Sequence, residues 1–261
     1  MSEDWPIPKS AYGLTYNQKD YAENIKRLAG MYSSAVILAT PNGDVFNSAT
    51  GFLFKPAGRA FLVTNAHVVD FYRTELAKNS DLKFQFGDKV FEPTVVAHHS
   101  EDRVDLSVID VDGMTFSVDP GYWRSSADVL EAYAPGRWPL DPPIDGSSTV
   151  IVGWPAMYRT RDGKEAEFGA FPLLGNVARS VQETSFVVQF EREHWIAGDH
   201  DATSPILVEK DFGGMSGSPV FAMHRRVHPL QLVGVVARYS ELLDGFLCTR
   251  ADLITAEGMV S

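Results

Sequence analysis

The feature that most constrains the fold of this chain is the spacing of its apolar residues. They gather in about a dozen short segments, rich in β-branched and aromatic side chains and separated by turn residues, a pattern typical of β-strands. No helical pattern alternates with these segments, which argues against a parallel βαβ sheet and favours an all-β sandwich or barrel. The predicted strands are 35–39, 51–54, 61–64, 82–86, 90–97, 106–109, 149–152, 186–190, 205–208, 220–222, 232–236 and 245–248.

Helices are expected only near the two ends of the chain. Tyr21, Ile25 and Leu28 repeat at i, i+4 and i+7, which predicts an N-terminal helix over 17–31. A short C-terminal helix is expected over 251–257. Neither segment supplies the repeated crossover helices of an α/β fold.

Four prolines fall between Tyr122 and Asp145, and they mark an irregular linker that divides the strands into two groups of about six. The sequence therefore predicts an all-β protein of two six-stranded antiparallel β-barrels. Its expected organisation is an extension with a helix (1–33), a first barrel (34–121), a linker (122–146) and a second barrel with the C-terminal helix (147–261).

Charge and cysteine content exclude some functions. The chain has 23 Lys and Arg against 34 Asp and Glu, a net charge of −11, so neither nucleic acid nor an anionic membrane is the expected partner. Cys248 is the only cysteine, which rules out an internal disulfide and favours a reducing compartment. The first residues lack the apolar stretch of a signal peptide, and no apolar run approaches the ~20 residues of a membrane span. A cytoplasmic location is expected.

The stretch "DFGGMSGSPVF" (211–221) places Ser216 among three glycines, ahead of a predicted strand. It is either a tight turn or a loop that presents a nucleophile. A serine nucleophile needs a base, and the base needs an acceptor on its other nitrogen. His67 directly follows a predicted strand in "TNAHVV", where a short helical turn is expected, and Asp105 stands at the start of another. Asp102 and Asp110 are the competing acids.

The order of these residues along the chain discriminates between hydrolase folds. An α/β-hydrolase requires serine, acid and then histidine, and the elbow pattern G-x-S-x-G fails here because Ser218 stands at its last position. A subtilisin-like order would need an aspartate at a strand end before His67, and no such residue is evident. His67, Asp105 and Ser216 follow the histidine, aspartate, serine order of the double β-barrel proteases.

Three blocks carry a resemblance to a known family: "TNAHVV", "DRVDLSVIDV" and "GGMSGSPVF". In this order they resemble the trypsin/chymotrypsin-like serine proteases, in particular their disulfide-free bacterial branch, which includes HtrA-type protease domains; no PDZ domain is expected here. Weaker similarity extends over most of 35–250, through "ATGFLF", "VIVGWP" and "LVGVVARYS".

The resemblance implies a chymotrypsin-like fold and a serine endopeptidase that cleaves polypeptides through an acyl-enzyme, without metal or cofactor. It implies that Ser216 is the nucleophile, that His67 is the general base and then acid, and that Asp105 holds the His67 tautomer. The backbone amides of Gly214 and Ser216 would form the oxyanion hole, which accounts for the glycines of the loop.

The specificity pocket departs from the trypsin pattern. Lys210 stands six residues before Ser216, where relatives often carry the residue at the base of the pocket, and Asp211 replaces it if the alignment shifts by one. Ala237, Arg238 and Tyr239 match the substrate-binding strand, and Tyr239 replaces a glycine of many relatives, which predicts a shallow pocket. We therefore expect specificity unlike that of trypsin.

Two other functions compatible with the same fold remain open. One is a catalytically silent binding module, and the other is a latent protease effector domain of a longer protein that a regulatory partner activates. Met215 stands where digestive relatives have an activating aspartate, so their activation route is not expected. The stretch "HWIAGDHD" (194–201) lacks a known metal-ligand spacing and is interpreted as a polar loop.

Overall fold

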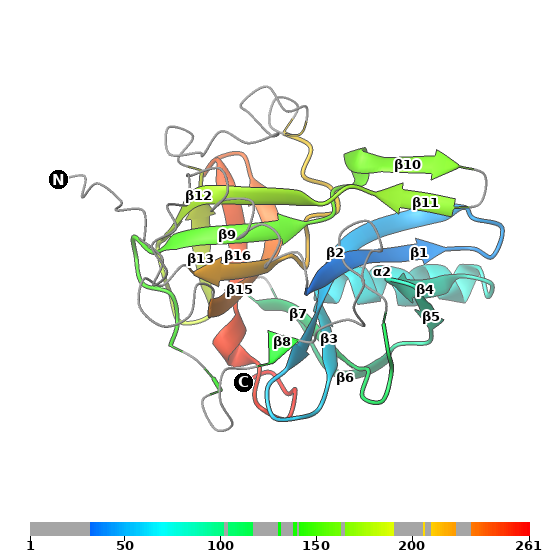
Figure 1. Ribbon diagram of the computed structural model, residues 1–261, viewed down its shortest axis with the longest axis horizontal. Helices are drawn as coiled ribbons and strands as arrows, with labels where there is room; N and C mark the ends of the chain where they lie inside the picture. The colour runs from blue at the N-terminus through cyan, green and yellow to red at the C-terminus, as the bar shows by residue number, and fades with distance from the viewer. Residues whose placement is uncertain are drawn as a thin grey trace, which may run out of the picture.

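The computed structural model describes residues 32–101, 104–116, 130–131, 138–139, 141–162, 165–190, 206, 210–222 and 231–261. Its strands form two groups, which lie side by side in Figure 1, the second on the left and the first on the right. Within the described residues, no helix is both long enough and apolar enough to cross a membrane.

The first group is an eight-stranded sheet. Its antiparallel strands follow the order β5-β4-β1-β2-β3-β7-β6, and β8 pairs with β2 in parallel. The sheet is a half-barrel and not a closed barrel, because no described pair joins the edge strands β5 and β6. The strands are β1 (Ser33–Ala39), β2 (Val45–Lys55), β3 (Phe61–Thr64), β4 (Lys83–Phe86), β5 (Lys89–Phe91), β6 (Thr94–Glu101), β7 (Val104–Asp110) and β8 (Leu130–Glu131).

The second group is a closed barrel of six antiparallel strands in the order β12-β13-β16-β15-β14-β9. A separate hairpin, β10 (Arg159–Asp162) with β11 (Glu165–Phe168), precedes β12. The barrel strands are β9 (Ser148–Gly153), β12 (Phe171–Arg179), β13 (Ser185–Gln189), β14 (Pro219–Ala222), β15 (Gln231–Ser240) and β16 (Gly245–Arg250).

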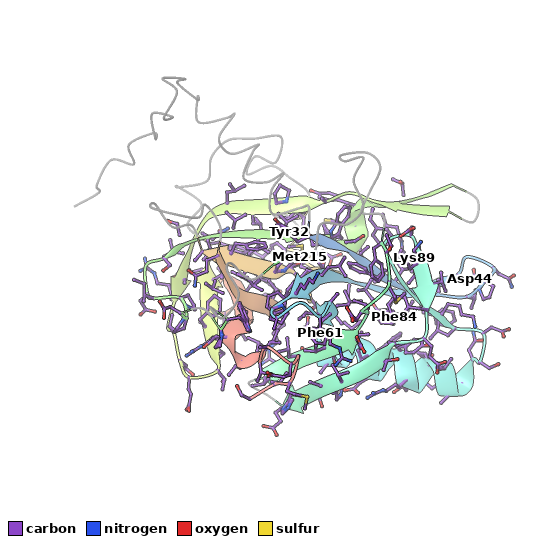
Figure 2. All side chains as sticks on the ribbon, turned by 60° about the horizontal axis from the view of Figure 1, so that its bottom comes forward. Tyr32, Asp44, Phe61, Phe84, Lys89 and Met215 are labelled. Atoms are coloured by element: carbon purple, nitrogen blue, oxygen red, sulfur yellow. The ribbon has the colours of Figure 1, made fainter. Side chains whose placement is uncertain are left out.

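The apolar core explains why the strands curl. Each group encloses its own buried cluster, which contains Phe84 in the first group and Met215 in the second; both side chains are labelled in Figure 2. A third cluster joins the groups, with Phe52 and Phe54 from β2 packed among Val150 and Phe221 of the second barrel. Burial of these side chains stabilises the contact between the two groups by removing apolar surface from water, and this contact fixes how residues of one group face those of the other.

Helix α2 (Ala66–Lys78) is much longer than the short turn expected around His67. It begins immediately after β3 and buries Ala66, Val68, Val69 and Tyr72 against the first sheet. The helix is drawn in cyan in Figure 1, where it starts near the centre of the molecule and runs to the right. Its N-terminal turn therefore lies where the two groups of strands meet.

The predicted fold class, two β-barrels of chymotrypsin-like type, is confirmed, with corrections. The first group is a half-barrel of eight strands, because the short β4–β5 hairpin extends one edge of the sheet and β8 pairs with β2 outside the main strand order. The C-terminal helix predicted over 251–257 is a single 3-10 turn, η3 (Ala251–Leu253), since the chain then bends back to pair Ile254 with Val260.

Some predicted elements were missed or cannot be compared. Strand β12 and the β10–β11 hairpin were not predicted, and of the predicted strand 205–208 only Ile206 is described, with helical backbone. The predicted helix 17–31 lies outside the described residues, as do most of the linker and the "HWIAGDHD" stretch. The predicted domain boundaries stay predictions.

Candidate active site

His67 and Asp105 come together where α2 meets β7. His67 is the second residue of the helix, and its Nδ1 lies 2.5 Å from Asp105 Oδ2. The carboxylate is 24% exposed and the imidazole 50%, so the pair is shielded on the Asp105 side while the other ring nitrogen of His67 remains accessible. This arrangement fixes the neutral ring as the tautomer with a proton on Nδ1 and leaves Nε2 to accept one.

Asp105 also caps the helix that carries His67. Asn65, the N-cap residue, makes no side-chain bond to the first turn, and instead its Nδ2 donates to the Asp105 carbonyl at 2.7 Å. The cap comes from the neighbouring strand, because the His67 amide donates to Asp105 Oδ1 at 3.0 Å. A carboxylate suits this place, since the helix dipole is positive at its N-terminus. Asp105 thus holds both the backbone and the ring of His67.

The loop before β14 presents Ser216. Its tight turn is closed by the Met215 amide, which donates to the Phe212 carbonyl at 3.0 Å. Gly214 is the third residue of this turn and has a φ of +91°, which a glycine adopts without steric cost. A Cβ on Gly214 would also lie 2.7 Å from the Trp154 carbonyl oxygen. The geometry of the loop therefore requires glycine at position 214.

Two amides in this loop have no protein acceptor among the described residues, those of Gly214 and Ser216. The other amides of 213–218 are all bonded: Gly213 donates to Asp211 Oδ1, Gly217 to the Val236 carbonyl and Ser218 to the Met215 carbonyl, as Met215 does to Phe212. Two amides without a described acceptor, one on each side of Met215, can receive a negative oxygen. They belong to the residues expected from the sequence to form an oxyanion hole, a role that stays a prediction.

Thr50 of β2 anchors the loop from the opposite group of strands. Its hydroxyl donates to the Gly214 carbonyl at 2.8 Å and accepts from the Trp154 amide at 2.9 Å. Its own amide donates to the Ser216 carbonyl at 2.8 Å. The peptides that carry the Gly214 and Ser216 amides are held separately, because the Gly213 carbonyl accepts from the Ala156 amide at 2.7 Å and the Met215 carbonyl from the Ser218 amide at 3.0 Å. Thr50 was not singled out in the sequence, because a threonine inside a strand gives no signal of such a role.

The triad candidates line one cleft of about 550 Å³ between the two groups. His67 and Asp105 contribute from the first group, and Ser216, Ala237 and Arg238 from the second. The Ser216 hydroxyl donates to the Ala237 carbonyl at 3.2 Å, and among the described hydrogen bonds it makes none to His67. A turn about the Ser216 Cα–Cβ bond redirects its hydroxyl without moving the backbone.

The predicted pocket residues separate into two sets. Ala237 and Arg238 line the cleft with the triad candidates. Lys210 and Tyr239 instead both contact Asp244: Tyr239 Oη lies 2.9 Å and Lys210 Nζ 3.8 Å from Asp244 Oδ1. Asp211 Oδ1 accepts a hydrogen bond from the Gly213 amide.

Around Tyr239 the expected pocket region is filled by aromatic rings. The ring of Tyr239 lies 4.5 Å from that of Phe212, between centroids, and 6.0 Å from those of Phe190 and Phe246. This packing is compatible with the shallow pocket expected from the sequence, which stays a prediction.

The competing candidates have other partners. Asp110 lies at the far end of β7 and pairs with Arg59 at 2.5 Å; this hydrogen bond lowers the pKa of Asp110. Asp102 is outside the described residues. Burial raises the pKa of the Cys248 thiol far above its ordinary value, so this cysteine stays protonated although it lines the cleft. Within the described part of the chain, no three His, Cys, Asp or Glu side chains group as metal ligands.

The chain was compared with protein families, curated proteins and solved structures. The family model of the trypsin-like peptidase domain matches residues 49–228. Among solved structures, the Rv3671c protease from M. tuberculosis in its active form is 18% identical, with 88% of this chain and 81% of that chain covered and a TM-score of 0.44. Its inactive form is also 18% identical, with coverages of 88% and 89% and a TM-score of 0.41. No curated protein matches the chain significantly.

The family assignment rests on the family model, whose span includes His67, Asp105 and Ser216. The matched residues make up more than half of the sequence. The chain therefore belongs to the family of trypsin-like peptidase domains.

Proposed function

We propose that this protein is a serine endopeptidase that cleaves polypeptides through an acyl-enzyme. Ser216 is the nucleophile, and His67 is the general base and then the general acid. Asp105 orients His67 and stabilises its protonated ring. The observation that carries the proposal is the 2.5 Å contact between His67 Nδ1 and Asp105 Oδ2 in the cleft that Ser216 also lines. Membership of the trypsin-like peptidase family supports a polypeptide substrate. The arrangement of Ser216, His67 and Asp105 supports their proposed roles.

In the proposed reaction, His67 Nε2 takes the proton of the Ser216 hydroxyl as Oγ attacks the scissile carbonyl. The oxygen of that carbonyl becomes negative and receives the amides of Gly214 and Ser216, which have no other described acceptor. His67 then gives its proton to the leaving amine, and the C–N bond breaks. Water then attacks the acyl carbon while His67 takes its proton, and His67 returns that proton to Ser216 Oγ as the ester C–O bond breaks.

A latent form of the same enzyme is the second candidate, and one observation favours it. The Ser216 hydroxyl donates to the Ala237 carbonyl rather than to His67. If this rotamer is the resting state, a substrate or a regulatory partner protein must displace it before Ser216 can react. A catalytically silent binding module has no comparable support, because it does not require an aligned His67–Asp105 pair.

The proposal is tested by incubating the protein with a mixture of unstructured peptides in H₂¹⁸O and analysing the products by mass spectrometry. We expect cleavage at internal bonds, with ¹⁸O in each new carboxylate, and no products from the Ser216→Ala variant. Cleavage that persists in Ser216→Ala would assign the activity to a contaminant or another residue. Absence of cleavage by the natural protein at every pH from 6 to 9 would contradict a constitutively active endopeptidase.

A further inference from the structure

Besides the His67–Asp105 pair, a carboxylate, an imidazole and a hydroxyl (of Asp70, His98 and Ser107, here called the second chain) are joined by close polar contacts. His98 Nε2 is 3.0 Å from Asp70 Oδ1, and His98 Nδ1 is 2.7 Å from Ser107 Oγ. Asp70 belongs to α2, His98 to β6 and Ser107 to β7, so these contacts connect the helix to two adjacent strands. His98 and Ser107 face each other directly in the antiparallel pairing of β6 and β7.

This second chain is not a second catalytic centre. Ser107 is fully buried, and a hydroxyl without access to the cleft cannot attack a peptide. The hydrogen bonds instead define a fixed geometry. Because the Asp70 carboxylate can only accept, neutral His98 carries its proton on Nε2, and Nδ1 then accepts from the Ser107 hydroxyl. The contact gives the buried Ser107 hydroxyl a partner, which a buried polar group requires.

The position of the second chain relates it to the active site. Asp70 follows His67 by three residues on α2, about one helical turn, and Ser107 follows Asp105 by two residues on β7. The same helix and the same strand are therefore connected at two points, by His67 with Asp105 and by Asp70 with Ser107 through His98.

The Asp70–His98 contact gives the helix a second polar attachment to the sheet. The hydrogen bonds at its start, from Asn65 Nδ2, the His67 amide and the His67 ring, all converge on Asp105. Bonds that meet at one residue leave the helix free to turn about that point. The buried face of α2 also resists such a turn, because its apolar side chains are closely packed against the sheet. The bond from Asp70 to His98 is directional and lies one turn away.

We propose that Asp70 and His98 are positioning residues of the active site, which hold α2 in the rotation that turns the His67 ring toward Asp105. This inference rests on the proposed function, in which the His67–Asp105 pair drives catalysis. Neither residue contacts the substrate. Their effect on the reaction passes through the orientation of His67.

The test compares four variants in the full chain: Asp70→Ala, Asp70→Asn, His98→Ala and the double variant with both alanines. Asp70→Asn keeps an oxygen that can accept from His98, whereas Asp70→Ala removes it. The matched control is Lys78→Ala, which breaks the Lys78–Glu75 ion pair (2.7 Å) inside the same helix without touching the sheet. Asp70 is 45% exposed, so its truncation leaves the core intact even if His98→Ala folds poorly.

Two readouts are measured on each variant. The first is the kinetics of Ser216 labelling by a fluorophosphonate probe, resolved into a maximal rate and a half-saturating probe concentration. The second is the downfield proton NMR signal of the short His67–Asp105 hydrogen bond, which reports alignment of the pair without requiring catalysis. Thermal unfolding is recorded alongside to separate alignment from loss of fold.

We expect Asp70→Ala and His98→Ala each to lower the maximal labelling rate about tenfold, with the half-saturating concentration unchanged and the NMR signal weakened. The double variant should also lose about tenfold rather than a hundredfold, because the two residues act as one unit. Asp70→Asn should retain at least half of the rate, and Lys78→Ala all of it.

Several results would overturn this inference: normal labelling and NMR signal in both alanine variants, equal loss in Lys78→Ala, equal loss in Asp70→Asn and Asp70→Ala, or multiplicative losses in the double variant. Failure of the proposed function looks different. In that case the natural protein itself is not labelled, and the NMR signal alone decides whether Asp70 and His98 align the pair.

Discussion

Replacing Asp105 by asparagine is expected to lower turnover by about 10⁴-fold. The asparagine amide would present an N–H to Nδ1 of His67 and favour the tautomer that carries its proton on Nε2, so the base could no longer accept the proton of Ser216. The substitution also exchanges the carboxylate that caps α2 through the His67 amide at 3.0 Å for a neutral group. The measurement is the rate of peptide cleavage or of Ser216 labelling, with thermal unfolding recorded for each protein.

Asp110→Asn is the matched control, because Asp110 is the acid at the opposite end of β7, is exposed to the same fraction (24%) as Asp105 and pairs with Arg59. It removes an equal charge and a hydrogen bond from the same strand but leaves His67 untouched. We expect its turnover to stay within about twofold of the natural protein, since the Arg59–Asp110 pair has no described contact with His67 or Ser216. Equal losses in Asp105→Asn and Asp110→Asn would show that charge on β7, not orientation of His67, controls the rate.

Replacing Gly217 by alanine is expected to destabilise the fold by about 2–6 kcal/mol and to abolish labelling of Ser216. Gly217 has a φ of +87°, and a Cβ there would lie 1.9 Å from the Thr50 carbonyl oxygen and 2.7 Å from Thr64 Oγ1. Both atoms belong to buried residues of the opposite group of strands, so the loop that carries Ser216 must move away. Chemical denaturation and probe labelling measure the two effects.

Gly58→Ala separates backbone strain from the clash. Gly58 has nearly the same φ, +90°, but a Cβ there would meet no atom within 4 Å. Its expected cost is the left-handed backbone alone, about 1–2 kcal/mol, with normal labelling of Ser216. If Gly217→Ala were no more destabilising than Gly58→Ala and kept its labelling, then the close approach of the nucleophile loop to Thr50 would not be essential.

The fold could be anticipated from the sequence to the extent that local patterns report it. Short apolar segments between turn residues predicted most of the strands, and the order of His67, Asp105 and Ser216 predicted two barrels. Strand β12 was missed because Pro172 and Gly175 interrupt its apolar residues. Proline and glycine are both uncommon in the interior of a strand. The length of α2 was missed because its polar outer face dilutes the apolar pattern.

The site was predictable where a residue type is required by chemistry. Ser216, His67, Asp105 and the glycines around Ser216 could be singled out in this way from their residue types and order. Thr50, Asp70 and His98 do not, because each acts through a contact with residues distant in sequence: Thr50 Oγ1 bonds the Gly214 carbonyl, 164 residues away. The role of Thr50 depends on how the two groups of strands pack, and the roles of Asp70 and His98 depend on how α2 packs on its own sheet. Only the structure shows either arrangement.

The most direct test of the central claim is fluorophosphonate labelling of the natural protein, with the site of attachment located by mass spectrometry. An activated serine is predicted to give a single adduct on Ser216, which Ser216→Ala lacks and which forms at least about a hundredfold more slowly in His67→Ala. Attachment at another residue, an unchanged rate in His67→Ala, or no adduct on the natural protein between pH 6 and 9 would contradict a working Ser216–His67 pair.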